Sequence, residues 1–105
     1  MVAERQPKTL SSAEALAVIR RIAADGLRIF VVDHARGRQR ERLVTRRQIE
    51  LRCQKGTIVE GPFVNAKGSW QVSLFRHAAG EQITCVVAIE WPENLIVVTV
   101  FRRRT

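Results

Sequence analysis

Two nearly continuous apolar runs, residues 83–90 and 95–101, lie close together near the C-terminus of the chain. Each run is short and rich in β-branched residues, so each predicts a strand that is apolar on both faces. Residues 92–94, Pro-Glu-Asn, separate the runs and predict a turn. The preceding segment, 69–77, alternates apolar and polar side chains, which predicts a half-buried strand. We therefore expect a three-stranded antiparallel meander at the centre of the fold.

Two capping boxes mark helix starts in the first half of the chain. Ser11-x-x-Glu14 and Thr45-x-x-Gln48 each pair a hydroxyl with a longer polar side chain three residues later, so that each can satisfy backbone groups at a helix start. The elements expected before the meander are a helix over 12–25 closed by Gly26 as a left-handed cap, a strand over 28–33, a helix over 34–43 capped by Asp33, a helix over 46–55 closed by Gly56, and a short strand over 57–59.

Helices followed by a run of strands define an α+β fold rather than an alternating α/β one. The chain has 105 residues, which is the size of one domain, so we expect a single domain over 1–105. The polar residues 1–10 are expected to form a flexible lead-in. The predicted architecture is a set of N-terminal helices packed on an antiparallel sheet.

The segment from Arg36 to Lys55 is strongly basic. It carries eight Lys and Arg residues against two acidic ones, Glu41 and Glu50, and the whole chain has a formal net charge of +8. Basic surfaces attract phosphate backbones and acidic protein segments, and charge also keeps a protein in solution. Nucleic acid is the partner that we favour from this pattern, with an acidic protein or a merely solvated face as the alternatives.

Several functional classes find no support in the sequence. Cys53 and Cys85 do not form a CxxC pair, and together with His34 and His77 they lack metal-ligand spacing, so neither a metal nor another cofactor is expected. No apolar stretch reaches the about 20 residues that cross a bilayer, and the N-terminus lacks the apolar core of a signal peptide. We expect a cytoplasmic protein with two free, buried thiols.

One face of the predicted helix 34–43 carries a candidate catalytic site. His34, Arg38 and Arg42 lie four residues apart, which places them on one side of a helix. An imidazole can move protons near neutral pH, and arginines can hold a phosphoryl group and stabilise its charge, so the three suit RNA cleavage. The alternative is a helix-capping histidine beside ordinary solvent-facing arginines.

The rest of that helix divides into two further faces. Arg36 and Arg40 point roughly away from the candidate site, where they can follow a nucleic-acid backbone. Ala35, Gln39 and Leu43 form a stripe that we expect to pack on the core.

Residues outside this helix complete the predicted site. Glu60, at the start of the sheet, can act as a catalytic base or pair with an arginine of the preceding helices. Trp70 can stack on a base or belong to the core. The three arginines that follow Phe101 either extend the basic surface or form a solubilising tail. The predicted nucleic-acid contacts are Arg36, Arg40, Arg46, Arg47, Trp70, Arg102 and Arg103.

Several short motifs occur in an order that resembles one protein family. They are His34-Ala35-x-x-Arg38-x-x-x-Arg42, Gly56-x-Ile58, Glu60, Gly68-x-Trp70 and Val98-Thr99-Val100-Phe101. Over about residues 30–101 the chain resembles the DUF4258 family of small bacterial proteins. This family is similar to the RelE-like toxins of type II toxin–antitoxin systems, which implies helices packed on a curved antiparallel sheet.

The resemblance implies an mRNA-cleaving toxin, active on free or ribosome-bound RNA, that is neutralised by an antitoxin protein. His34, Arg38 and Arg42 match the family motif, and Glu60 and Trp70 match weaker positions. RelE-like nucleases often use a tyrosine near the end of the last strand, but this chain has no tyrosine. Phe cannot transfer a proton, so either His34 takes that role or the chain is a non-catalytic module that binds RNA, DNA or an acidic protein.

Overall fold

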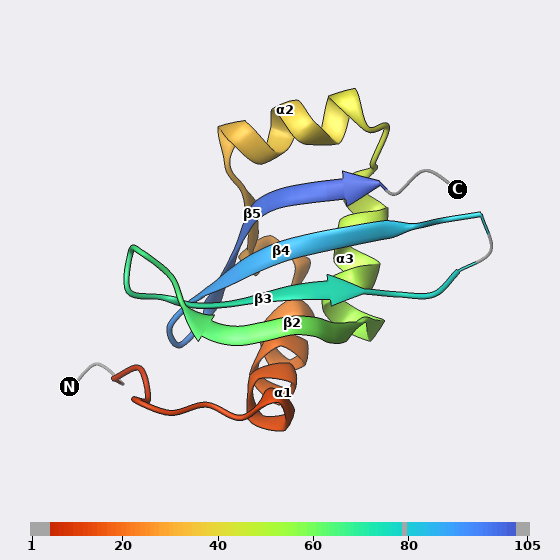
Figure 1. Ribbon diagram of the computed structural model, residues 1–105. Helices are drawn as coiled ribbons and strands as arrows, with labels where there is room; N and C mark the ends of the chain where they lie inside the picture. Colours follow the sequence, from red (N-terminus) through yellow and green to blue (C-terminus); the bar gives the residue numbers. More distant parts are fainter. Residues whose placement is uncertain (1–4, 79, 103–105) are drawn as a thin grey trace.

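The computed structural model describes residues 5–78 and 80–102. In this part of the chain, three helices precede most of a five-stranded sheet, which confirms the α+β class (Figure 1). Within the same residues, no helix is both long and apolar enough to cross a membrane. The helices are α1 (Ser12–Ala23), α2 (Asp33–Glu41) and α3 (Arg46–Lys55), with a 3₁₀ turn, η1 (Gly26–Arg28), after α1. The strands are β1 (Ile29–Val31), β2 (Thr57–Val64), β3 (Trp70–Phe75), β4 (Ile83–Glu90) and β5 (Asn94–Arg102).

The strands lie in the order β1-β5-β4-β3-β2. The predicted antiparallel meander is present as β3, β4 and β5, and β2 pairs with β3 in the same antiparallel sense. At the other edge, β1 pairs with β5 in parallel, so the sheet is mixed rather than wholly antiparallel as expected. A parallel pair needs a long connection between its strands, and here α2, α3 and the rest of the meander supply it.

One face of the sheet holds the hydrophobic core. Trp70, Val72 and Leu74 alternate along β3 with less buried neighbours and point to this face, where α1 and α3 cover them (Figure 1). The central strand β4 is buried for nearly its whole length, as its continuous apolar run predicts. α2 lies beside β5 at one border of the opposite face, which no helix covers in the described part of the chain (Figure 1).

The two capping boxes start α1 and α3 where the sequence predicts. The Ser11 hydroxyl accepts from the Glu14 backbone N–H at 3.1 Å, and the Glu14 carboxylate accepts from the Ser11 N–H at 3.0 Å. Thr45 and Gln48 make the same reciprocal pair at 3.1 and 2.9 Å. These bonds satisfy N–H groups that have no partner within the helix, so both helix starts are set locally.

Two predicted helix caps are wrong. Gly26 does not close α1, because the helix ends at Ala23 and Ala24 caps it in right-handed conformation, while Gly26 begins the 3₁₀ turn. Asp33 is not the cap of α2 but its first residue, and Val32 stands in the capping position with no side-chain bond. A carboxylate in the first helical turn still faces the positive end of the helix dipole.

The end of α2 also differs from the prediction. The helix stops at Glu41 instead of Leu43, and Leu43 takes a left-handed backbone with φ of 54°. Its side chain is 80% exposed, so it does not join Ala35 on the core. The left-handed residue redirects the chain so that Val44 enters the core in its place.

Reciprocal polar contacts tie α1 to the end of α3. Arg20 donates to the carbonyl oxygens of Gln54 and Gly56, and the Gln54 amide donates to the carbonyl oxygen of Ala23 at 3.1 Å. Together with the apolar contacts beneath the sheet, these bonds fix α1 against the elements that follow it.

Candidate functional site

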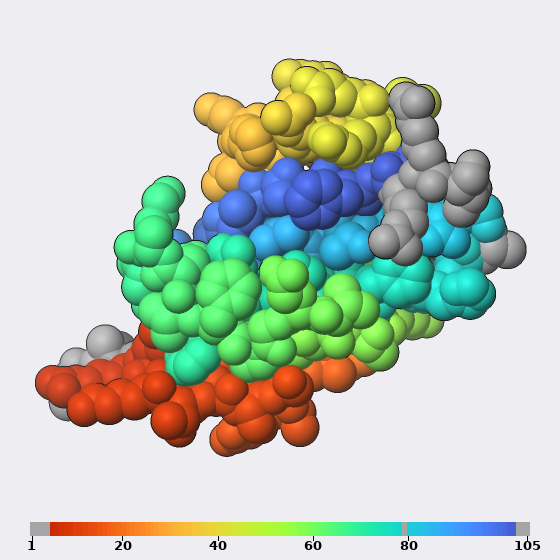
Figure 2. Space-filling view, viewed as in Figure 1, coloured from red at the N-terminus to blue at the C-terminus, as the bar shows by residue number. Residues whose placement is uncertain are grey.

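A groove of about 930 Å³ lies on the sheet face opposite the core helices. Figure 2, which shows this face, leaves it visible between α2 at the top and the β2–β3 hairpin at the left. The lining residues come from the residue that follows α2, from four strands and from the β3–β4 connection. Those that matter for chemistry are Arg42, Glu60, Gln71, Ser73, Phe101 and Arg102. The groove is therefore assembled from segments far apart in the sequence.

The floor of the groove follows from the alternation of the strands. Along β3, Gln71 and Ser73 point away from the core because their neighbours point into it. Thr84 of β4 and Thr99 of β5 line the same groove from the adjacent strands. The floor thus presents neutral amide and hydroxyl groups, which can both donate and accept hydrogen bonds, beside the apolar side chains of Phe75, Val86 and Val98.

Glu60 reaches the groove through an irregularity in β2. The pairing of β2 with β3 shifts register on both sides of Glu60, which lies opposite Ser73. An extra residue in one strand changes the side to which side chains point, and here both Val59 and Glu60 line the groove. Within the described residues, Glu60 makes no ion pair, so the predicted pairing with a helix arginine is not seen.

Arg42 forms the border of the groove at the end of α2. Its guanidinium carbon lies 5.8 Å from the centre of the Phe101 ring, which is cation–π distance. One of its terminal nitrogens, Nη1, is buried without a hydrogen-bond partner in the described part of the chain. Among the described residues, the carboxylate nearest to that nitrogen is Glu41, at 3.9 Å. The Arg42 guanidinium therefore keeps unused hydrogen-bonding capacity.

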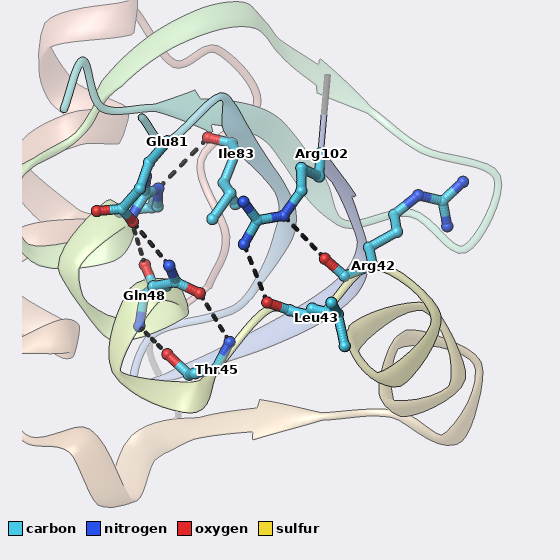
Figure 3. Close-up of polar contacts among 8 residues, drawn as sticks. Arg42, Leu43, Thr45, Gln48, Glu81, Ile83 and Arg102 are labelled. Carbon is cyan, nitrogen blue, oxygen red and sulfur yellow. Dashed lines mark hydrogen bonds and ion pairs between the residues drawn. The ribbon is translucent and has the colours of Figure 1, made fainter. Parts of the chain in front are cut away.

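Arg102, predicted to contact nucleic acid, holds Arg42 in place. Its guanidinium donates to the carbonyl oxygens of Arg42, at 2.8 Å, and of Leu43, at 3.0 Å (Figure 3). These are carbonyls that a helix end leaves without partners, so Arg102 caps α2 from the last strand. Figure 3 shows the Arg42 side chain extending away from this joint.

The structure does not bring His34, Arg38 and Arg42 into one site. Arg42 alone of the three lines the groove. His34 is exposed in the first turn of α2, at the far end of the helix from Arg42. Arg38 is engaged by Glu41, with 2.6 Å between Arg38 Nη1 and Glu41 Oε2. Residues spaced by four share a helix face, but two helical turns separate the first from the last.

The other predicted arginines are distributed over several surfaces. Arg36 and Arg40 line a smaller hollow of about 400 Å³, together with Arg46. Arg46 is held there by Glu50 at 3.0 Å and by the carbonyl oxygens of Gly26 and Ile29, both at 2.8 Å. Arg47 is exposed on α3, and Arg103 lies outside the described residues. Only part of the basic segment is thus free to meet a partner.

Trp70 belongs to the core. Its side chain is 8% exposed, and its indole N–H donates to the carbonyl oxygen of Pro7 at 2.9 Å. A ring that stacks on a base must offer one face to the ligand, and Trp70 has none free here.

Arg52 is a buried basic residue, although it belongs to the basic segment that was expected at the surface. It is 0% exposed, and its Nη1 lies 3.3 Å from Glu81 Oε1. Its Nε donates to the carbonyl oxygen of Ile83 at 3.3 Å, and Gln48 donates to Glu81 at 2.8 Å (Figure 3). This network ties α3 to the β3–β4 connection, whose end reaches the groove through Gln82.

Cys53 and Cys85 are free and buried, as predicted. Burial raises the pKa of the Cys85 thiol to about 12, and burial with the neighbouring Cys85 raises the pKa of Cys53 still further. Protonated thiols are poor nucleophiles and poor metal ligands. Among the described residues, no three His, Cys, Asp or Glu side chains gather as metal ligands would.

Both thiols are therefore expected to be inert in the folded protein. Ellman's reagent at pH 8 should detect almost no thiol in native protein and two per chain after denaturation in urea. Rapid reaction of either cysteine in the native state would contradict the burial described above.

The fold and the groove define a small α+β protein with an arginine-bordered groove on an uncovered sheet face. The chain belongs to the family described as Domain of unknown function (DUF4258), whose model matches residues 31–102. This range confirms the predicted membership and differs by one residue at each end from the expected 30–101. No match was found to a curated protein or to a solved structure.

Proposed function

We propose that the protein binds RNA along the groove on the uncovered face of the sheet. The observation that carries the proposal is the position of Arg42, whose guanidinium borders a groove floored by hydrogen-bonding side chains. A guanidinium binds phosphate through paired, charge-assisted hydrogen bonds. Amide and hydroxyl groups on the floor can reach base edges and the 2′-hydroxyl, which is the group that distinguishes RNA from DNA.

The other exposed arginines are expected to attract RNA to the protein but not to fix its position in the groove. Arg36 and Arg40 lie on α2 away from the groove, and Arg47 lies on α3. Charges that are not part of a groove contribute a long-range, salt-dependent attraction without fixing the strand. A substitution in the groove should therefore cost more affinity than the loss of the same charge elsewhere.

Replacing Arg42 with glutamine is expected to weaken RNA binding about tenfold, because one charge-assisted phosphate contact is lost. The measurement is fluorescence anisotropy of a labelled RNA oligonucleotide, with a DNA oligonucleotide of the same sequence in parallel. Arg47→Gln, which removes the same charge from an exposed site outside the groove, is the control and should cost less than about twofold. Equal effects of the two substitutions would contradict binding in the groove.

Cleavage of the bound RNA is a second candidate, favoured because Glu60 and Arg42 line the same groove. Glu60 would accept the proton of a 2′-hydroxyl, whose oxygen attacks the adjacent phosphorus while the bond from phosphorus to the 5′-oxygen breaks. The products would be a 2′,3′-cyclic phosphate and a 5′-hydroxyl end, with water protonating the leaving oxygen. Arg42 would stabilise the charge that develops on the phosphate oxygens.

This second candidate corresponds to a RelE-like mRNA-cleaving toxin, which would need an antitoxin partner. Expression of the chain alone should then arrest growth and fragment mRNA. A neighbouring gene product that co-purifies with the chain and restores growth would support the proposal. Expression that is harmless and leaves mRNA intact would contradict RNA cleavage but not RNA binding.

A further inference from the structure

Phe101 is an aromatic side chain that the core does not use. It pairs across the sheet with Thr84, and it lines the groove with 48% of its surface exposed. Its neighbour Val100 is fully buried, so the alternation of β5 turns the Phe101 ring to the uncovered face. An exposed aromatic ring in a groove lined by both apolar and polar side chains is a surface to which a flat ligand can bind.

The surroundings of Phe101 narrow the kind of ligand. The Arg42 guanidinium lies over the ring, 5.8 Å from its centre, yet nearly half of the Phe101 surface stays exposed with that group in place. A nucleobase can stack both on an aromatic ring and on a guanidinium plane. Ser73 and Thr84, on the same floor, offer donors and acceptors to the edge of a stacked base.

We infer that Phe101 and Arg42 form a stacking site for one unpaired base, so that the groove selects single-stranded RNA. The inference rests on the proposed RNA binding and adds the form of RNA that is bound. A base within a duplex is covered by its neighbours on both faces and cannot offer a face to Phe101 without leaving the stack. The groove therefore distinguishes single-stranded from double-stranded RNA by whether a base is free to stack. Charge cannot distinguish them, because both forms carry phosphates.

The test compares two exposed phenylalanines. Phe101→Leu removes the ring from the groove but keeps an apolar side chain, and Phe63→Leu does the same on β2, outside the groove, where Phe63 is 41% exposed. The probes are a labelled, non-self-complementary 12-nucleotide RNA and its duplex with the complementary strand. Circular dichroism and the thermal midpoint show whether each variant keeps the fold.

Phe101→Leu is expected to weaken binding of the single strand by about 5-fold or more, and to leave duplex binding unchanged. Phe63→Leu should alter neither, and Phe101→Trp should restore single-strand binding because it restores a stacking surface. A single strand that carries 2-aminopurine should lose fluorescence on binding to the wild-type protein but not to Phe101→Leu. This fluorescence reports on stacking separately from affinity.

Each other result overturns the inference, and the results can be told apart. In one such result, wild-type protein binds single strands with an affinity that Arg42→Gln lowers and Phe101→Leu does not. That result would contradict stacking on Phe101 but would support RNA binding in the groove. Equal losses on single strand and duplex with Phe101→Leu would show that the ring does not select unpaired bases. If wild-type protein binds a labelled poly-glutamate peptide but neither RNA, the groove is a protein-binding surface, and both proposals fail.

Discussion

In the proposed cleavage reaction, replacing Glu60 with glutamine is expected to lower the rate by about a hundredfold or more while RNA affinity changes little. Glutamine keeps the shape of the side chain but cannot accept the proton of a 2′-hydroxyl. Glu60 is the acidic side chain among the described residues that line the groove with Arg42. The measurement is the single-turnover rate of cleavage of a labelled RNA at saturating protein, with the product ends identified by their chemistry.

His34→Ala is the matched control for this prediction. His34 is the proton-transfer residue that the family motif favours, but it lies outside the groove. We expect its removal to change the cleavage rate less than about twofold, because a general base must lie within hydrogen-bonding reach of the proton that it takes. A large loss of cleavage rate with His34→Ala and none with Glu60→Gln would show that His34, in the first turn of α2, is the proton-transfer residue.

Replacing Glu81 with alanine is expected to lower the free energy of unfolding by about 3 kcal/mol. The substitution removes the carboxylate that faces the fully buried guanidinium of Arg52 and leaves that charge without an ionic partner. The cost of an unpaired charge away from water exceeds that of most surface substitutions. Urea denaturation followed by tryptophan emission measures the change.

Glu93→Ala is the control because it also breaks an ion pair with an arginine. Glu93 Oε2 lies 3.1 Å from Arg28 Nη1, but both side chains are largely exposed, so the expected loss is below about 1 kcal/mol. Similar losses for the two substitutions would show that water reaches Arg52 despite its position. Because Gln48 in the first turn of α3 also bonds to Glu81, part of the Glu81→Ala effect is expected from the start of that helix.

Local signals in the sequence predict the starts of α1 and α3 and the meander well. A capping box acts over three residues, and strand alternation acts over two, so neither depends on the rest of the fold. The end of α2 is set instead by a contact with a distant residue, because Arg102 bonds to carbonyl oxygens about sixty positions earlier in the chain. The parallel pairing of β1 likewise depends on where β5 lies.

The candidate site was predicted only in part, for the same reason. Helical spacing groups His34 with Arg42, but the groove belongs to the sheet, and of these residues only Arg42, which follows α2, lines it. Strand alternation would have found Gln71 and Ser73, which share the face opposite Trp70 and Leu74. A helical pattern would also have found Arg52, because Ile49, Arg52 and Cys53 fall on one side of α3 and all three are buried.

The segment that the family model matches is shorter than the part of the chain that packs into one core, because α1 lies outside the match and contributes to that core. The matched residues 31–102 contain the whole groove but begin after α1, which supplies Ile19 and Ile22 to the core and ties itself to α3 through Arg20. Excising the matched segment would remove α1 from α3, β2 and β5, on which it packs, and would uncover that part of the core. A domain boundary for expression or for comparison of relatives should therefore be drawn before Ser11, because the matched segment contains the groove and the preceding helix completes the core.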